Sequence, residues 1–174
     1  MRILIRMCTS QDGFIITAGG LPVQLAFGGW DAGALGFYEF QARCDAVLMG
    51  RTAFEPALPA PRWPWGDRSV YVLGSQRPPG TPEHAVIDND PARLLRRLRE
   101  AGQGGDIHLV GGARTIEACR ALGALDEIRL MVLPMFVGAG RRLTPEVSTG
   151  IALTHDGARD WPNGVVELSY SVNP

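Results

Sequence analysis

Three apolar runs in this sequence end in the same manner, and they restrict the fold more than any other feature. The runs are AVLM (46–49), SVYVL (69–73) and IHLV (107–110), and each is followed at once by glycine. Short apolar runs bounded by glycine are typical of buried strands, and helix-type sequence follows the first and the third. This alternation predicts an α/β fold with a largely parallel central sheet.

The remaining chain supplies further elements. Asp90-Pro91 is expected to start a helix that ends at Gly102, because Asp is a good N-cap and Pro suits the first helical position. The other expected helices are Ala32–Arg43, Ala113–Leu122 and a short one opening at Gly50. The other expected strands are Ile3–Cys8, Phe14–Thr17, Ala85–Ile87, Glu127–Val137, Ile151–Thr154 and Val165–Val172. We therefore expect a single domain over residues 1–174, a three-layer sandwich with about eight strands and an antiparallel C-terminal edge.

Composition excludes several classes of partner. The net charge of −1 gives no electrostatic reason to expect binding to nucleic acid or to a membrane surface. No apolar run approaches the roughly 20 residues that span a bilayer, and the opening MRILIRMC is too short for a signal-peptide core. Cys8, Cys44 and Cys119 have neither metal-site spacing nor the even count of a disulfide framework. We expect a cytoplasmic protein with no resident metal.

The residues that follow the three strand-like runs are suited to phosphate. In an open α/β sheet, ligands bind outside the carboxyl ends of the strands, where helix N-termini present free N–H groups. Glycine allows close approach of the backbone, Ser or Thr adds a hydroxyl, and Arg offers a planar fork. Each turn alone is more typical of a plain connection, and none matches G-x-G-x-x-G or a P-loop. Together the turns predict an extended ligand with a pyrophosphate and a terminal phosphate, such as a dinucleotide.

Four segments carry a resemblance to a known family. They are SQDGFI (10–15), MGRTAFE (49–55), VLGSQR (72–77) and LVGGARTIEACRALGALDEIRLMVLPMFVGAGRRL (109–143). In this order they resemble the dihydrofolate-reductase-like superfamily, and most closely its riboflavin-biosynthesis branch. That branch comprises the reductase domain of the bifunctional deaminase-reductase and its stand-alone relatives.

The resemblance implies an NADPH-dependent reductase that transfers hydride to a small heterocycle of pyrimidine or pterin type, such as a ribosylaminopyrimidine phosphate of riboflavin biosynthesis. A homodimer is also implied, in which Glu127–Val137 would bury an apolar face. The zinc-binding H-x-E and P-C-x-x-C pattern of the deaminase half is absent from the sequence. We therefore expect the reductase activity alone.

The same resemblance assigns cofactor contacts. Gly50, Arg51 and Thr52 would flank the adenosine-side phosphates, with Arg51 on the 2′-phosphate. The adenine ribose would lie along Leu73, Gly74 and Ser75, with Arg77 assisting Arg51. The pyrophosphate would rest on Val110, Gly111, Gly112, Ala113, Arg114 and Thr115. The nicotinamide would reach Cys8, Thr9 and Ile15.

On the substrate side the candidates are Ser10, Asp12, Trp30 and Glu39, with Asp12 also the candidate catalytic acid. Each has a plainer interpretation as a turn residue, a packed aromatic or a solvated carboxylate. Dihydrofolate reductases carry an acidic residue early in the helix after the first strand, and its place here falls near Ala34, which argues against folate reduction. Thr144 departs from the phenylalanine common at its place in the riboflavin branch.

Two alternatives remain open at this stage. The fold could serve as a non-catalytic nucleotide-binding or dimerisation module, which the missing acid near Ala34 would suit. The chain could also be a reductase that uses a flavin-type cofactor in place of NADPH.

Overall fold

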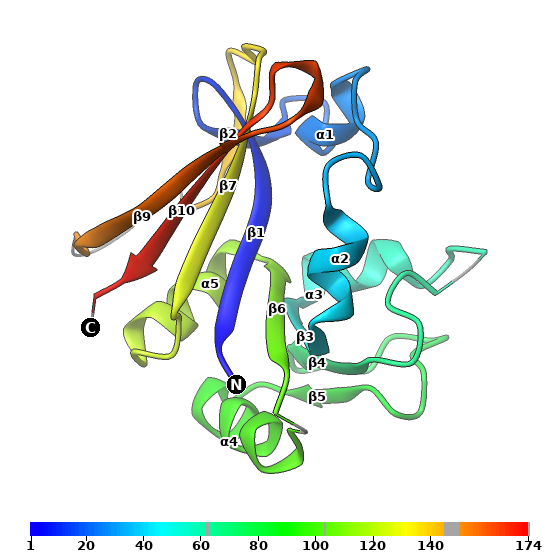
Figure 1. Cartoon of the computed structure of the whole chain (residues 1–174). Coiled ribbons are helices and arrows are strands. Elements are labelled where there is room, and N and C mark those ends of the chain that lie inside the picture. Colours follow the sequence, from blue (N-terminus) through cyan, green and yellow to red (C-terminus); the bar gives the residue numbers. More distant parts are fainter. Residues whose placement is uncertain (62, 103, 145–149, 174) are drawn as a thin grey trace. The chain divides into compact units, whose positions relative to one another are not determined.

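The computed structural model describes residues 1–61, 63–102, 104–144 and 150–173 (Figure 1). Contacts group the chain into two compact units. Unit 1 comprises Met1–Leu4 and Ala42–Leu125, and unit 2 comprises Ile5–Gln41 and Asp126–Pro174. Strand β1, Ile3–Ser10, begins in unit 1 and continues into unit 2. The main sheet has eight strands in the order β5-β4-β3-β6-β1-β7-β10-β9.

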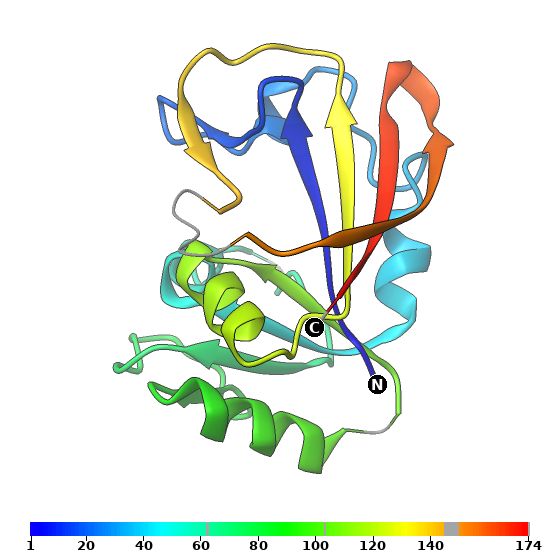
Figure 2. The same cartoon turned by 90° about the vertical axis from the view of Figure 1, so that its left-hand side faces the viewer.

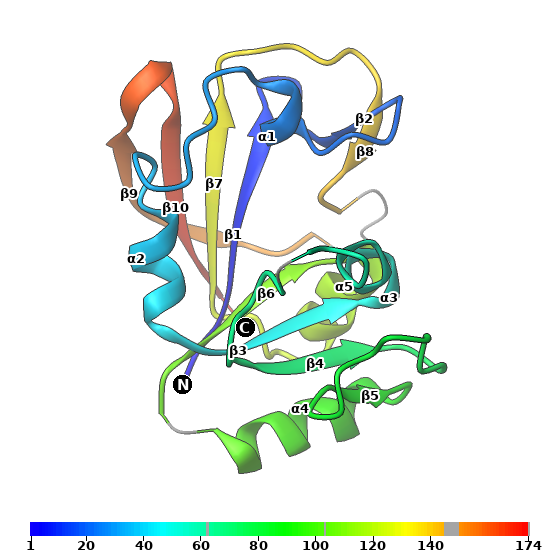
Figure 3. The same ribbon diagram turned by 90° about the vertical axis from the view of Figure 1, so that its right-hand side faces the viewer.

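Unit 1 is built from parallel strands and helices. Its strands are β3 (Cys44–Gly50), β4 (Ser69–Leu73), β5 (Val86–Asp88) and β6 (Asp106–Gly111), which pair parallel with one another, and β6 pairs parallel with β1. Its helices are α3 (Arg51–Phe54), the 3-10 turn Glu55–Ala57, α4 (Pro91–Ala101) and α5 (Ala113–Ala121). In Figure 3, β3 and β4 run side by side in one direction, with α4 beneath them.

Strand alternation explains the core of unit 1. Val70 and Val72 of β4 point to the same face as Val47 and Met49 of β3, where they pack in one buried cluster with Phe54. The opposite face carries Tyr71, and α4 contributes the buried leucines Leu94, Leu95 and Leu98. Because successive side chains of a strand point to opposite faces, both faces of these strands are apolar.

Unit 2 contains the antiparallel part of the sheet. Its strands β7 (Glu127–Leu133), β10 (Val166–Val172) and β9 (Leu153–Asp160) pair antiparallel in that order. Figure 2 shows β7 beside β1. A separate two-stranded ribbon pairs β2 (Phe14–Thr17) with β8 (Gly140–Arg142), and the helices are α1 (Val23–Ala26), α2 (Phe37–Ala42) and the 3-10 turn Pro162–Gly164. A buried cluster that includes Cys8, Leu35 and Met131 forms the core.

The predicted fold class is confirmed: the sheet has eight strands, is mostly parallel and has an antiparallel C-terminal edge. β2 and β4 have the predicted bounds, and α4 begins after Asp90, whose side chain accepts a hydrogen bond from the Arg93 N–H. The single-domain organisation stays a prediction.

Three expected boundaries were wrong for identifiable reasons. The helix expected from Ala32 begins only at Phe37, because the Asp31 carboxylate accepts the N–H groups of Gly33 and Ala34 and closes a turn there. β7 ends at Leu133, before Pro134, which cannot donate to a strand ladder. β9 begins at Leu153 and continues to Asp160, further than expected, through a polar and almost fully exposed edge.

Candidate functional site

The carboxyl ends of β3 and β6 approach so closely that only glycine fits. A Cβ added to Gly112 would lie 3.1 Å from both Cα and N of Gly50, and one added to Gly50 would lie 2.7 Å from Oγ1 of Thr115. Gly112 also has φ of +95°, a backbone conformation that side chains other than glycine rarely adopt. Two of the three predicted turns therefore meet at one edge of unit 1, where Gly50 and Gly111 are buried and Gly112 is half-buried.

The N-terminus of α5 lies at this edge. Gly112 is its N-cap and provides no side-chain cap, and the first N–H groups of a helix lack intrahelical acceptors. The partial positive charge of a nine-residue helix is concentrated at the same place. Arg114 is exposed, whereas Thr115 is 2% exposed and its hydroxyl lies under the two glycines. Thr115 therefore packs the turn, and Arg114 is the side chain that solvent reaches.

The third turn lies next to the first. A Cβ on Gly74 would be 3.7 Å from Cβ of Arg51, an ordinary contact, and the Gly74 N–H donates to the carbonyl of Asp88. Arg51 is exposed and donates to both carboxylate oxygens of Glu55, at 3.1 and 3.0 Å. An exposed pair of this kind is weakly held, so Arg51 can exchange its carboxylate for another anion at small cost.

The other residues predicted to contact the cofactor at this edge differ in solvent exposure and in the hydrogen bonds they already make. Thr52 and Ser75 are exposed, and Leu73 and Val110 are half-buried. Arg77 is committed elsewhere: its guanidinium donates to the carbonyls of Ala85, Pro82 and Glu83. Arg77 thus closes the loop before β5, and the assistance to Arg51 expected of it stays a prediction.

In unit 2, Ser10 and Asp12 form an internal network. The Ser10 hydroxyl donates to Asp12 Oδ1 at 2.6 Å and accepts the Phe14 N–H at 3.0 Å. The Asp12 carboxylate also accepts the N–H groups of Val137 and Gly138, the latter at 2.7 Å. The hydrogen bond from Ser10, followed by those from the two backbone groups, holds the pKa of Asp12 below its usual value. Asp12 is therefore an ionised brace between two loops, which is a poor state for a proton donor.

Basic side chains occupy the same region. Arg142 donates to the backbone carbonyl of Asp12, and its guanidinium lies 4.5 Å from the centre of the Phe14 ring. Arg141 and Arg142 are exposed on β8 and line an open hollow of about 530 Å³ together with Phe14 and Ile16 of β2. This hollow has no carboxylate among its described lining residues.

The residues expected near the nicotinamide are mostly covered. Cys8 is 5% exposed, and burial raises the pKa of its thiol to about 12, so it is a packed neutral group. Thr9 is 8% exposed, and its hydroxyl donates to the carbonyl of Ser10. Ile15 is half-buried on β2. Of the three, Ile15 presents the most surface to a ligand.

The aromatic and acidic candidates also differ in how much of their surface is exposed. Trp30 is half-buried against the core of unit 2, with an edge contact to Phe37 at 6.2 Å between ring centres. Glu39 is exposed on α2. Trp65, which lies in the loop before β4, is 6% exposed and packs against Trp63 in the core of unit 1.

One important residue escaped the sequence reasoning. Arg6 is buried on β1, where its guanidinium pairs with Glu167 at 2.8 and 3.1 Å and donates to the carbonyls of Leu35 and Gly36. The indole N–H of Trp161 donates to the same carboxylate at 2.7 Å. Burial acts to raise the pKa of Glu167, but these partners outweigh it and lower that pKa. The signal was present in the sequence: a lone arginine inside an apolar strand must find a partner.

Sequence comparison places these features in a family. A family model described as the RibD C-terminal domain matches residues 2–166. The chain belongs to the RibD C-terminal domain family. Two uncharacterized proteins of Bacillus subtilis (strain 168) are similar over nearly their whole length. YwjB is 26% identical over 171 residues, 97% of each chain, and YyaP is 28% identical over 183 residues, 99% of this chain and 95% of its own.

Solved structures share the fold. A putative riboflavin biosynthesis protein from Shewanella sp. PV-4 superposes with a TM-score of 0.82 at 20% identity, covering all of both chains. The deaminase/5-amino-6-(5-phosphoribosylamino)uracil reductase of Thermotoga maritima gives 0.72 at 15%, covering 99% of this chain and 56% of its own. Schistosoma mansoni dihydrofolate reductase gives 0.66 at 16%, covering 99% of both. The predicted dihydrofolate-reductase-like fold and family are thus confirmed.

Membrane-spanning helices and metal sites are two other features that bear on function. Among the residues that the structure describes, no helix is long and apolar enough to cross a membrane. Within the same residues, no group of three or more His, Cys, Asp or Glu side chains is arranged to hold a metal ion.

Proposed function

We propose that this chain is an NADPH-dependent reductase that transfers hydride to a small heterocyclic substrate, of the pyrimidine class that RibD-type reductases act on. The observation that carries the proposal is the approach of Gly50 and Gly112 beside the N-terminus of α5. The N-terminus of α5, with its free N–H groups and the half-buried Gly112 as N-cap, fits a pyrophosphate. Membership of the RibD C-terminal domain family supports the same conclusion.

The proposed cofactor contacts follow from which groups are available. Gly111, Gly112, Ala113 and Arg114 would hold the pyrophosphate. Arg51 would leave Glu55 to bind the 2′-phosphate that distinguishes NADPH from NADH. When bound, the nicotinamide supplies the hydride, so the protein needs no nucleophile and contributes positioning and electrostatics.

On the substrate side, Asp12 is proposed to hold its own loop against the Val137–Gly138 segment, because its carboxylate is ionised and already accepts hydrogen bonds from Ser10, Val137 and Gly138. Solvent would then supply the proton. Trp30 and Glu39 remain the proposed substrate contacts, the first by stacking and the second by its exposed carboxylate.

The test is a titration of purified protein with NADPH and NADH. The account expects tighter binding of NADPH, and Arg51→Ala should lose that preference while it still binds NADH. Arg96→Ala, which removes an exposed arginine from α4 of the same unit, is the matched control and should change neither affinity. Equal affinities of the unaltered protein for the two cofactors would remove Arg51 from its proposed role.

One observation favours a second candidate, a nucleotide-binding module without catalysis. Ser10 and Asp12, the expected substrate residues, are engaged in hydrogen bonds to their own loops. Following NADPH absorbance with a panel of pyrimidine and pterin substrates separates the two candidates, because binding without turnover would favour the module. A yellow preparation containing extractable flavin would favour a flavin-type cofactor instead.

Two further properties belong to the proposal. The chain would act in the cytoplasm, and it would form a homodimer in which the segment Glu127–Val137 buries an apolar face. Light scattering that finds only a monomer would overturn the dimer.

A further inference from the structure

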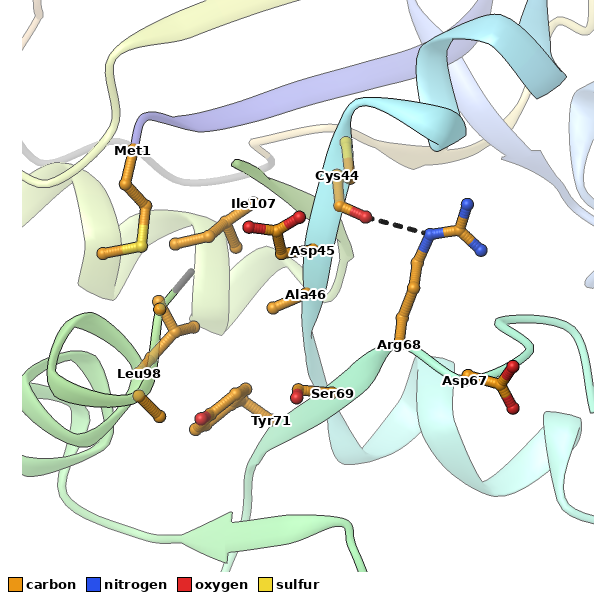
Figure 4. Close-up of a pocket in the computed structure, with 12 residues that line it drawn as sticks. Met1, Cys44, Asp45, Ala46, Asp67, Arg68, Ser69, Tyr71, Leu98 and Ile107 are labelled. Atoms are coloured by element: carbon orange, nitrogen blue, oxygen red, sulfur yellow. Dashed lines mark hydrogen bonds between the residues drawn. The ribbon is translucent and has the colours of Figure 1, made fainter. Parts of the chain in front are cut away.

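A cavity of about 380 Å³ lies in unit 1 at the amino ends of the strands, whereas the glycine turns lie at the carboxyl ends of the same strands (Figure 4). The start of β3, the start of β4 and the last turn of α4 form its walls. The volume falls within the range of about 300 to 1,000 Å³ that is usual for small-molecule sites. Nothing in the proposed reductase site uses it.

Tyr71 gives the cavity its most informative polar group. The residue is 4% exposed and lines the cavity, and its hydroxyl has no hydrogen-bond partner among the residues that the structure describes. Burial raises the pKa of this phenol, an effect that Arg97 partly offsets, so the hydroxyl keeps its proton and acts as a donor. A bound acceptor would give this hydroxyl a partner in place of water.

The remaining lining sets the shape and charge of a ligand. Ala46, Leu98 and Ile107 present apolar surface, which suits a flat ring. The rim carries the carboxylates of Asp45 and Asp67.

The rim carries charges of both signs. Asp45 accepts the Gly105 N–H at 2.5 Å. Arg68 donates to the carbonyl of Cys44, as Figure 4 shows. Two carboxylates and one guanidinium therefore stand at the cavity, which disfavours an anionic ligand.

We infer that this cavity binds a small neutral heteroaromatic amine, a flat ring in which an amino group stands next to a ring nitrogen. The ring nitrogen accepts from the Tyr71 hydroxyl, the amino group donates to a rim carboxylate, and the ring packs against Ala46 and Leu98. This site is separate from the proposed cofactor edge and does not depend on it.

The test uses 2-aminobenzothiazole, with benzothiazole-2-carboxylate as an anion of the same shape. Binding is followed by calorimetry and by backbone amide shifts of the full chain. We expect saturable binding of the amine, with shifts at Asp45, Ala46, Ser69 and Tyr71, and markedly weaker binding of the carboxylate.

Two variants localise the binding. Tyr71→Phe keeps the ring and should weaken binding about fivefold, the value of one ordinary hydrogen bond. Its stability should not fall, since the hydroxyl has no protein partner among the described residues to lose. Ala101→Trp, on an exposed residue of the lining, should abolish binding, whereas Ala92→Trp on the first turn of the same helix should not.

The inference is overturned by any of four results: no saturable binding, equal binding of the carboxylate, unchanged affinity in Tyr71→Phe, or shifts centred on Gly50 and Gly112. Failure of NADPH to bind would leave this inference standing, and failure here would leave the reductase proposal standing.

Discussion

Replacing Gly112 by alanine tests the geometry of the glycine edge most sharply. The residue has φ of +95° and ψ of 106°, and a Cβ there would lie 3.1 Å from the backbone of Gly50 and 3.3 Å from the Thr115 hydroxyl. A non-glycine residue held in such a conformation costs roughly 1–3 kcal/mol, and the close contact with backbone adds to that strain. We expect Gly112→Ala to lower the free energy of unfolding by about 2–4 kcal/mol.

Substitutions at two other glycines of unit 1 separate the cost of backbone strain from the cost of the close contact with Gly50. Gly123 has φ of +58° with nothing within 4 Å of an added Cβ, so Gly123→Ala carries the backbone strain alone, about 1 kcal/mol. Gly74→Ala meets only an ordinary contact at 3.7 Å and should change stability by less than about 0.5 kcal/mol. Urea unfolding followed by far-ultraviolet circular dichroism measures all three. If Gly112→Ala lowered the free energy of unfolding no more than Gly123→Ala does, the close approach to Gly50 would not contribute to the cost.

Three other substitutions have defined outcomes. Glu55→Gln should tighten NADPH binding about two- to fivefold and leave NADH unchanged, because it frees Arg51 from its carboxylate; unchanged NADPH binding would contradict this. Arg6→Met should cost about 3–5 kcal/mol of unfolding free energy by leaving Glu167 buried and unpaired, and adding Glu167→Gln should restore part of it in urea unfolding. The pKa of Asp88 is held at about 2 by its hydrogen bonds with Arg93, so the stability it contributes is present above its unfolded pKa near 3.8 and lost as pH falls toward 2. In Asp88→Asn the loss of stability between pH 5 and pH 2.5 should therefore be smaller than in the unaltered protein.

Much of the fold could be predicted because its buried strands have a clear signature. β3, β4 and β6 are covered on both faces, so they appear as continuous apolar runs that end at glycine. The short β8, Gly140–Arg142, is exposed at every residue and carries no such signature. Edge strands of this kind are stabilised by pairing with a neighbour, which the local sequence does not encode.

The candidate site could be predicted where it depends on local sequence, and not where it depends on contacts between distant residues. Gly112 was expected at a phosphate-type turn, and the structure adds that it touches Gly50, so a larger residue there should cost stability as well as binding. Asp12 was expected to face the substrate, yet its carboxylate braces Gly138, 126 residues away in the chain. Arg6 stands out as a lone arginine in an apolar strand, but its partner Glu167 lies 161 residues away. The local sequence does not identify a partner at such a separation.

The central claim is that the edge formed by Gly50, Gly74 and Gly112 holds NADPH. The direct measurement is a titration of the isotopically labelled protein with NADPH, followed by backbone amide shifts. The account predicts saturable binding, with the largest shifts at Gly112, Ala113 and Arg114 and further shifts at Arg51. Saturable binding that left these amides unchanged, or no binding, would contradict it.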